Sequence, residues 1–283
     1  MKNKRYYLTQ GLLIGGMVIV CIIFLIPLFF MVSLSLQDQE TILLDGGAKF
    51  FPEVITFDNY KTIFSTSYSE TTPIARWLFN SFVVATGSAL LTILIASLSA
   101  FAYARLKFKG RKLLFNALLL TMMIPSVVSL IPNYLTISNL NLKNTLTALI
   151  IPTLGGVTNV FLIRQFLYSI PKELDEAALM DGANHFKLFF RIILPQMIPI
   201  LVVVGLNTFL ASWNDILWPL IINTSKDYRT MTAGLENVQS VFEENIPCIM
   251  AATVVSAVPV LVVYIFSQKY LIKGISITSG MKE

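Results

Sequence analysis

Long apolar runs alternate with short polar connections along the whole chain. A helix needs roughly 20 predominantly apolar residues to cross the hydrocarbon core of a bilayer. Six runs reach that length and contain essentially no charged residue, so we predict an all-α membrane protein with six transmembrane helices in a single domain, 1–283. The expected spans are 11–34, 78–103, 113–135, 144–167, 192–222 and 247–270.

The first run follows three basic residues and could be taken for a secretory signal. Its apolar part is too long for a signal, and no small-residue cleavage site follows it. We therefore expect a retained membrane anchor.

Basic residues indicate which side of the membrane each connection occupies, because Lys and Arg collect in short cytoplasmic loops. They gather before the first span, between the second and third, and after the sixth. This distribution predicts that the N-terminus, the C-terminus and the connection at 169–190 are all cytoplasmic. The residues concerned are Lys2, Lys4, Arg5, Arg105, Lys107, Lys109, Arg111, Lys112, Lys269, Lys273 and Lys282.

The composition agrees with a multi-pass protein of a cell membrane. Hydrophobic residues make up 55% and charged residues 13% of the 283 residues, and the mean hydropathy is +0.72, which places the chain in a bilayer. The net charge of +5 is accounted for by topology and anionic membrane lipid, so no nucleic-acid partner is expected. Cys21 and Cys248 are too apolar in setting and too far apart to suggest a disulfide or a metal site.

Prolines and alanines mark special places in the spans. Pro125 and Pro132 in the third span, and Pro195 and Pro199 in the fifth, predict kinks that shape a cavity or a hinge, although membrane helices are in general richer in proline. In the second span, small residues recur every fourth position and allow another helix to approach closely. They are Ala96, Ala100 and Ala104.

The connection between the fourth and fifth spans reads QFLYSIPKELDEAALMDGANHFKLFFRIILPQMIP. Pro171 suits the first turn of a helix, and Glu173, Asp175 and Glu176 favour its positive end. Gly182 can end that helix in the left-handed conformation, and Asn184 can cap a second one. The pattern predicts a helix, a sharp turn and a helix.

Two small residues follow the acidic ones in this connection. Ala177 and Ala178 would let the surface of another protein come close, so the first helix is a candidate docking element. An ordinary capped cytoplasmic loop is the alternative.

This stretch resembles the Glu-Ala-Ala loop of ATP-binding-cassette (ABC) importer permeases, with the pattern E-A-A-x-x-x-G followed by I-x-L-P. In that family the loop inserts into a cleft on an ATPase subunit. The resemblance implies a cytoplasmic coupling loop, 169–190, that transmits nucleotide-driven motion into the fourth and fifth spans. The residues that match are Glu176, Ala177, Ala178, Gly182, Ile192, Leu194 and Pro195, with Asp181 and Ala183 in the common D-G-A form.

A second stretch, ASWNDILWPLIIN at 211–223 with RTMTAGL after it, is similar to maltose-type (MalG-like) sugar permeases. The resemblance runs through nearly the whole chain and implies the fold of a type I ABC importer permease (MetI-like). It also implies a sugar or oligosaccharide as substrate. The implied partners are a second homologous permease, a dimer of cytoplasmic ABC ATPase subunits and an extracellular substrate-binding protein, which would meet the loop at 224–244.

Polar residues in the spans are candidates for the translocation path. Asn207 is one, because a polar amide within a span normally faces the interior of the bundle; Asn133 and Asn159 join it. Near the end of the fifth span, aromatic faces and hydrogen-bonding groups combine as a sugar requires, although tryptophans also form interfacial belts. These residues are Trp213, Asn214, Asp215 and Trp218. The resemblance implies that the partner permease supplies most sugar contacts.

The chain has no G-x-x-x-x-G-K-[ST] pattern, so ATP and Mg²⁺ are expected on the partner ATPase subunits and no cofactor on this chain. We expect no catalytic residue and no metal ligand, because the sole histidine, His185, lies in the cytoplasmic connection. Three alternatives stay open: a permease for a non-sugar solute, an ion-coupled secondary transporter and a membrane-embedded enzyme. The uncharged spans argue against the second, and the missing nucleophile and base argue against the third.

Overall fold

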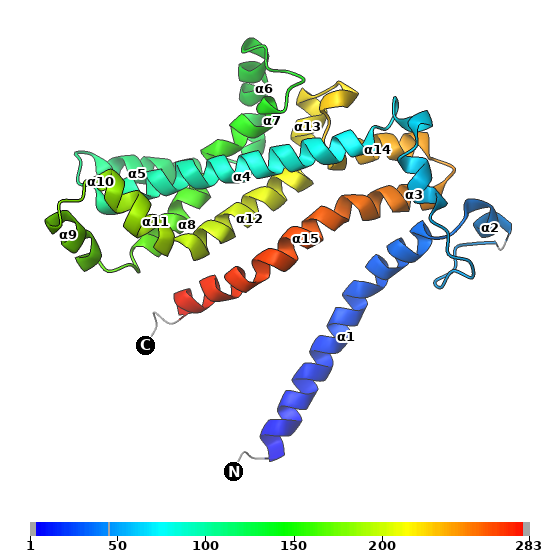
Figure 1. Ribbon diagram of the computed structural model, residues 1–283, viewed down its shortest axis with the longest axis horizontal. Coiled ribbons are helices and arrows are strands. Elements are labelled where there is room, and N and C mark those ends of the chain that lie inside the picture. Colours follow the sequence, from blue (N-terminus) through cyan, green and yellow to red (C-terminus); the bar gives the residue numbers. More distant parts are fainter. Residues whose placement is uncertain (1–3, 45, 280–283) are drawn as a thin grey trace. The chain divides into compact units, whose positions relative to one another are not determined.

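The computed structural model describes residues 4–44 and 46–279, with side chains at 9–44 and 46–269. Lys2 and Lys282, two of the residues used to assign topology, lie outside the described residues, as do the side chains of Lys4, Arg5 and Lys273. Every regular element within the described ranges is helical, which confirms the predicted all-α class (Figure 1).

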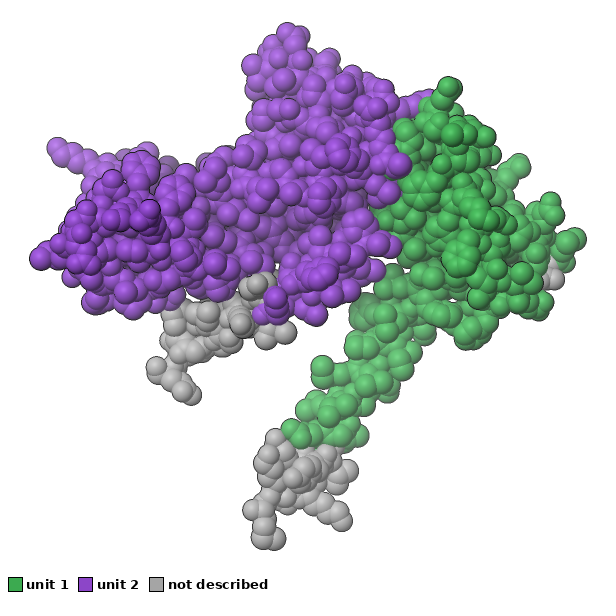
Figure 2. Space-filling model, viewed as in Figure 1, with its two compact units in different colours: residues 1–74, 235–257 green, residues 75–234, 258–283 purple. Residues whose placement is uncertain are grey.

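The chain forms two compact units, coloured separately in Figure 2. Unit 1 comprises Met1–Ile74 and Leu235–Ala257, and unit 2 comprises Ala75–Gly234 and Val258–Glu283. The helices α14 (Met231–Val241) and α15 (Ile246–Ser279) are each divided between the two units.

Unit 1 contains the long helix α1 (Lys4–Ser35), whose apolar side chains are largely exposed, as expected of a helix in contact with hydrocarbon. Its C-terminal end is fixed by buried polar contacts: the Asn59 amide donates to the carbonyls of Ser35 (2.9 Å) and Gln37 (2.8 Å). The first of these bonds satisfies a carbonyl that the helix end leaves without a partner. The other elements of this unit are α2 (Gln39–Leu44), α3 (Asp58–Ile63) and η1 (Thr66–Tyr68).

Unit 2 is built around α4 (Ile74–Arg105) and α12 (Ile198–Asn214), which run side by side (Figure 1). The predicted alanine stripe of α4 is buried in the main apolar core, where it allows the close packing expected of small residues. The other helices that supply this core include α8 (Val157–Leu167). The remaining elements are α5 (Arg111–Thr121), η2 (Ser126–Ser129), α6 (Leu130–Asn139), α7 (Thr147–Ile150), η3 (Ile151–Gly155), α9 (Glu173–Met180), α10 (His185–Leu188), the π-helical η4 (Phe189–Ile193), α11 (Leu194–Gln196), α13 (Leu217–Ile222) and η5 (Lys226–Tyr228).

Three helices in the described residues are long and apolar enough to cross a membrane, and the number is six if each of three bent pairs counts as one span. The straight candidates are Thr9–Ser35, Ile74–Arg105 and Ile246–Lys269. The bent pairs are Arg111–Thr121 with Ser126–Asn139 (95°), Thr147–Gly155 with Val157–Leu167 (49°), and His185–Gln196 with Ile198–Asn214 (78°).

Prolines account for two of these bends. Pro125 lies in the 95° break, and Pro195 and Pro199 flank the 78° break, as the sequence predicts. The third break falls at Gly156 and was not predicted, although Pro152 and the Gly155–Gly156 pair lie beside it.

Candidate functional site

The segment from α9 to α10 has the predicted helix, turn and helix. Gly182 ends the first helix with a φ of +78°, a left-handed conformation that costs glycine little. The side chain of Asn184 accepts a hydrogen bond from the backbone N–H of Lys187 at 2.8 Å and so caps α10. Local chemistry therefore accounts for the turn and for the start of the second helix.

The residues of the Glu-Ala-Ala pattern divide between two faces of the segment. Glu176, Ala177, Asp181 and Gly182 are exposed. Ala178 is buried and Ala183 is half-buried, and both pack into the main core of unit 2. The inner face anchors the segment, and the outer face presents an acidic and a small residue that another protein could contact.

Asp175 is buried, unlike its exposed neighbour Glu176. One oxygen of its carboxylate, Oδ2, lies 3.1 Å from Nε of Arg105, the last residue of α4. Burial raises the pKa of the Asp175 carboxyl from its usual range, and the Arg105 charge acts in the opposite direction. The pairing joins elements that are far apart in the sequence, so no local pattern could have predicted it.

The chain continues from α10 into a single π-helical turn, η4. The sequence predicts a plain helix here, running toward Pro195. A π-helical turn is rare and often marks a functional site. It lies directly before the 78° bend that leads into α12.

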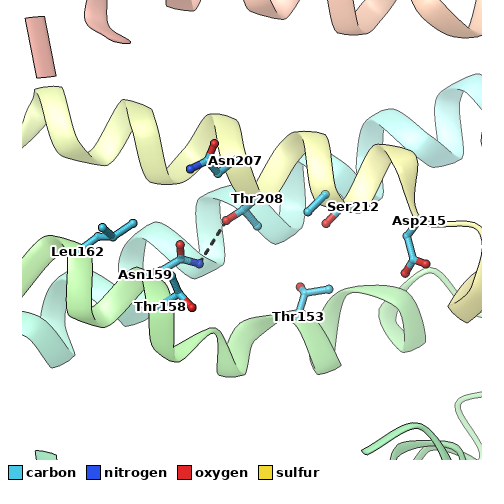
Figure 3. Close-up of a pocket in the computed structure, with 9 residues that line it drawn as sticks. Thr153, Thr158, Asn159, Leu162, Asn207, Thr208, Ser212 and Asp215 are labelled. Atoms are coloured by element: carbon cyan, nitrogen blue, oxygen red, sulfur yellow. Dashed lines mark hydrogen bonds between the residues drawn. The ribbon is translucent and has the colours of Figure 1, made fainter. Parts of the chain in front are cut away.

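A cavity of about 360 Å³, largely apolar in lining but with several polar side chains, lies within unit 2, between η3, α8 and α12 (Figure 3). The amide of Asn159 donates to Oγ1 of Thr208 across it at 3.5 Å. No basic side chain lines the cavity, so its polar groups are hydroxyls, amides and one carboxylate. The lining residues are Thr153, Thr158, Asn159, Leu162, Asn207, Thr208, Ala211, Ser212 and Asp215.

Three of the predicted path residues line this cavity: Asn159, Asn207 and Asp215. Asp215 also uses its carboxylate locally, since Oδ1 accepts a hydrogen bond from the backbone N–H of Trp218 at 3.3 Å. The arrangement offers acceptors and donors to a hydroxyl-rich solute.

The other predicted path residues lie elsewhere. Trp213 is 2% exposed and stacks on Phe209, with ring centroids 5.7 Å apart, inside the core. The indole N–H of Trp218 donates to the carbonyl of Ala148 at 3.0 Å. Asn133 is half-buried in α6, and Asn214 is exposed at the end of α12, and neither lines the cavity.

Several cavity residues were not singled out from the sequence. On α12, a signal was available, because Thr208 and Ser212 are polar, lie four residues apart in an apolar run and so share one face. Thr153 and Thr158 carry no such signal, since their orientation depends on the 49° bend between them. Within the described residues, no group of three His, Cys, Asp or Glu side chains could hold a metal ion.

Comparison with known proteins gives concordant matches. The family described as "Binding-protein-dependent transport system inner membrane component" matches residues 92–277. The arabinooligosaccharides transport system permease protein AraQ of Halalkalibacterium halodurans is 32% identical over 283 residues, which is 100% of both chains.

Two solved structures share the fold. One, of a bacterial ABC transporter involved in the import of the acidic polysaccharide alginate, has a TM-score of 0.78 at 20% identity and covers 96% of this chain and 98% of its own. The other, of a bacterial alginate ABC transporter in complex with an alginate pentasaccharide-bound periplasmic protein, has a TM-score of 0.64 at 18% identity and covers 93% of both chains.

Proposed function

Because the chain belongs to the family of binding-protein-dependent transport system inner membrane components, we propose that it is the permease subunit of an ATP-driven importer for a sugar or oligosaccharide. Subunits of this family are ABC transporter permeases and are not themselves enzymes. The resemblance to sugar permeases that the sequence predicts is confirmed by the relatives.

The observation that carries the proposal is the outward face of α9. Glu176 and Ala177 are exposed, while Ala178 beside them is buried in the core. An acidic residue next to a small one on an anchored helix can fit into a cleft of an ATPase subunit and receive a push from it. We propose that 169–190 is the coupling loop and that Glu176, Ala177, Ala178, Asp181, Gly182 and Ala183 form its contact and its support.

The proposed topology has six spans, each bent pair counting as one, with both termini and the coupling loop in the cytoplasm of a bacterial cell. The basic segment around Arg111 supports this orientation, because five of the eight residues from Arg105 to Lys112 are arginine or lysine. The loop at 224–244 would then meet the extracellular substrate-binding protein.

The proposed mechanism is alternating access. ATP binding closes the dimer of partner ATPase subunits, which press on α9 and switch this chain and a second, homologous permease from inward-open to outward-open. A loaded binding protein favours the outward-open state, and the switch follows from its differential affinity for the two states.

The cavity supports a polyhydroxylated substrate. Its lining of Thr, Ser and Asn side chains matches the hydrogen-bonding needs of sugar hydroxyls, and AraQ is named for arabinooligosaccharides. We propose that the cavity forms this subunit's share of the translocation path.

The test uses the whole importer in proteoliposomes, with the ATPase subunits copurified through this chain. Glu176→Gln should stop copurification or uncouple ATP hydrolysis from uptake. Glu40→Gln, an exposed glutamate of α2 outside the loop, is the matched control and should leave both intact.

Normal uptake and normal ATPase coupling in Glu176→Gln would overturn the assignment of the loop. Uptake that needs a cation gradient and ignores ATP would replace the proposal with an ion-coupled transporter. Uptake of a charged non-sugar solute in preference to every oligosaccharide would keep the importer and overturn the substrate class.

A further inference from the structure

One arginine joins three parts of unit 2. The side chain of Arg105 is 3% exposed, its Nη2 donates to the carbonyl of Ile170 at 2.7 Å, and its Nε lies 3.1 Å from Oδ2 of Asp175. Arg105 ends α4, Ile170 lies within the connection between α8 and α9, and Asp175 lies in the first turn of α9. The guanidinium therefore holds both sides of the turn that leads into α9.

An arginine side chain restricts the directions of its contacts as well as their distances. A guanidinium is planar and presents its N–H groups in a rigid fork, whereas a lysine ammonium is a point charge on a flexible chain. Nη2 donates a hydrogen bond to the carbonyl of Ile170, whereas Nε meets Asp175 as an ion pair without hydrogen-bond geometry. One side chain therefore ties the end of α4 both to the connection before α9 and to the first turn of α9.

Burial makes the two charges dependent on each other. The side chain of Asp175 is 13% exposed, so neither charge is well hydrated. Removing one partner from a buried ion pair leaves an uncompensated charge. Apolar packing reinforces the link, because Ala104, Leu167, Ile170 and Ala178 belong to the same core.

Two neighbouring acidic residues of α9 therefore lie in different environments. Glu176 is exposed and Asp175 beside it is turned inward to Arg105. The two carboxylates are adjacent in the sequence and about 100° apart around the helix. A push on the exposed residue can therefore reach α4 through the buried pair.

We propose that Arg105 and Asp175 are positioning residues that fasten α9 to α4, so that α4 moves with the coupling loop when the ATPase subunits close. This rests on the proposed function of α9 as the coupling helix, and adds the second predicted span to the fourth and fifth as a receiver of the motion.

The experiment separates docking from transmission in the assembled importer. Asp175→Asn keeps the shape of the side chain and removes its charge, and Arg105→Lys keeps the charge and removes the fork. Both should still copurify with the ATPase subunits, while solute transported per ATP hydrolysed falls about tenfold. Asp175→Glu should recover part of the lost coupling, since it restores the carboxylate.

A distance measurement gives the readout that loss of structure alone would not produce. Spin labels are placed at Leu98→Cys on α4 and Met180→Cys on α9, both exposed, with Cys21 and Cys248 replaced by alanine. Double electron–electron resonance compares the ATP-free state with the state trapped by ATP and vanadate. The distance should stay the same in the otherwise unaltered protein and change between states in Asp175→Asn.

Two results would overturn the inference. One is normal transport per ATP in both Asp175→Asn and Arg105→Lys. The other is a distance that changes between the two states even with Arg105 and Asp175 intact. If Glu176→Gln abolishes coupling in the same preparations, either result rejects the α4 link alone, whereas a harmless Glu176→Gln rejects the proposed function as well.

Discussion

The backbone of Gly234 lies against the ring of Trp77, so that a β-carbon at position 234 would be 2.3 Å from Cε3 of that ring. Trp77 is fully buried, and its indole N–H donates to the carbonyl of Lys226 at 2.7 Å. Burial and this hydrogen bond hold the ring in place. Only glycine lets the first turn of α14 approach α4 this closely.

Gly234→Ala should therefore lower the free energy of unfolding by about 1–3 kcal/mol, the usual cost of overpacking a core. Thermal unfolding of the detergent-solubilised protein, followed by tryptophan fluorescence, measures the change. Gly15→Ala in α1 is the control, because a β-carbon there has no atom within 4 Å. Equal melting temperatures for the two variants would contradict the packing described.

The turn after α9 needs glycine at position 182 for its backbone conformation and not for lack of room for a side chain. A β-carbon at Gly182 would meet nothing within 4 Å, but φ is +78°. Gly182→Val should lose coupling between ATP hydrolysis and uptake, because a left-handed conformation costs an L-residue about 1–2 kcal/mol. Gly182→Asn should retain more coupling, since asparagine tolerates this region better. The reverse order of the two variants would show that the turn is not what matters.

The fold could be predicted from the sequence wherever a local rule decides it. The caps at Gly182 and Asn184 and the bends beside Pro125 and Pro195 follow from the chemistry of those residues. The bend at Gly156 was not predicted, although the Gly155–Gly156 pair is a local feature that favours a kink. No residue type within Phe189–Ile193 indicated the π-helical turn η4.

The residues of the candidate site could likewise be predicted only in part. Asn159 and Asn207 were predicted from polarity within a span, and both line the cavity. Trp213 has a side chain suited to a sugar, but its position on α12 places that side chain in the core, stacked on Phe209. Residue type alone does not say which face of a helix lines a cavity.

Protonation of Asp175 should give a pH dependence with a defined sign. Burial raises the pKa of this carboxyl above its ordinary 3.8, so the folded protein binds the proton more readily than the unfolded chain. Its contribution to stability is then full below the unfolded pKa and is lost as pH rises through the folded pKa.

Asp175→Asn removes that contribution. As the pH falls through this window, the difference in melting temperature between the two proteins should shift in favour of the unaltered protein. Both are measured side by side in detergent, between pH 7 and the lowest pH at which both stay soluble. A gain by the variant instead would mean that Arg105 outweighs burial in setting the pKa.

The cavity hydroxyls should matter for transport and not for assembly. Thr208→Val keeps the shape of the side chain and removes its hydrogen bonds, each worth about 0.5–1.5 kcal/mol, so uptake at limiting substrate should fall roughly two- to tenfold. Thr121→Val, an exposed threonine outside the cavity, is the control. Equal uptake by both would remove Thr208 from the path.

The central claim is that the outward face of α9 touches an ATPase subunit. A photoreactive amino acid placed at the exposed Ala177, in the assembled importer, tests it most directly, with the same amino acid at the exposed Thr41 of α2 as control. The account predicts a covalent adduct to the ATPase subunit from position 177 and none from position 41. No such adduct from position 177, with the importer intact and active, would contradict it.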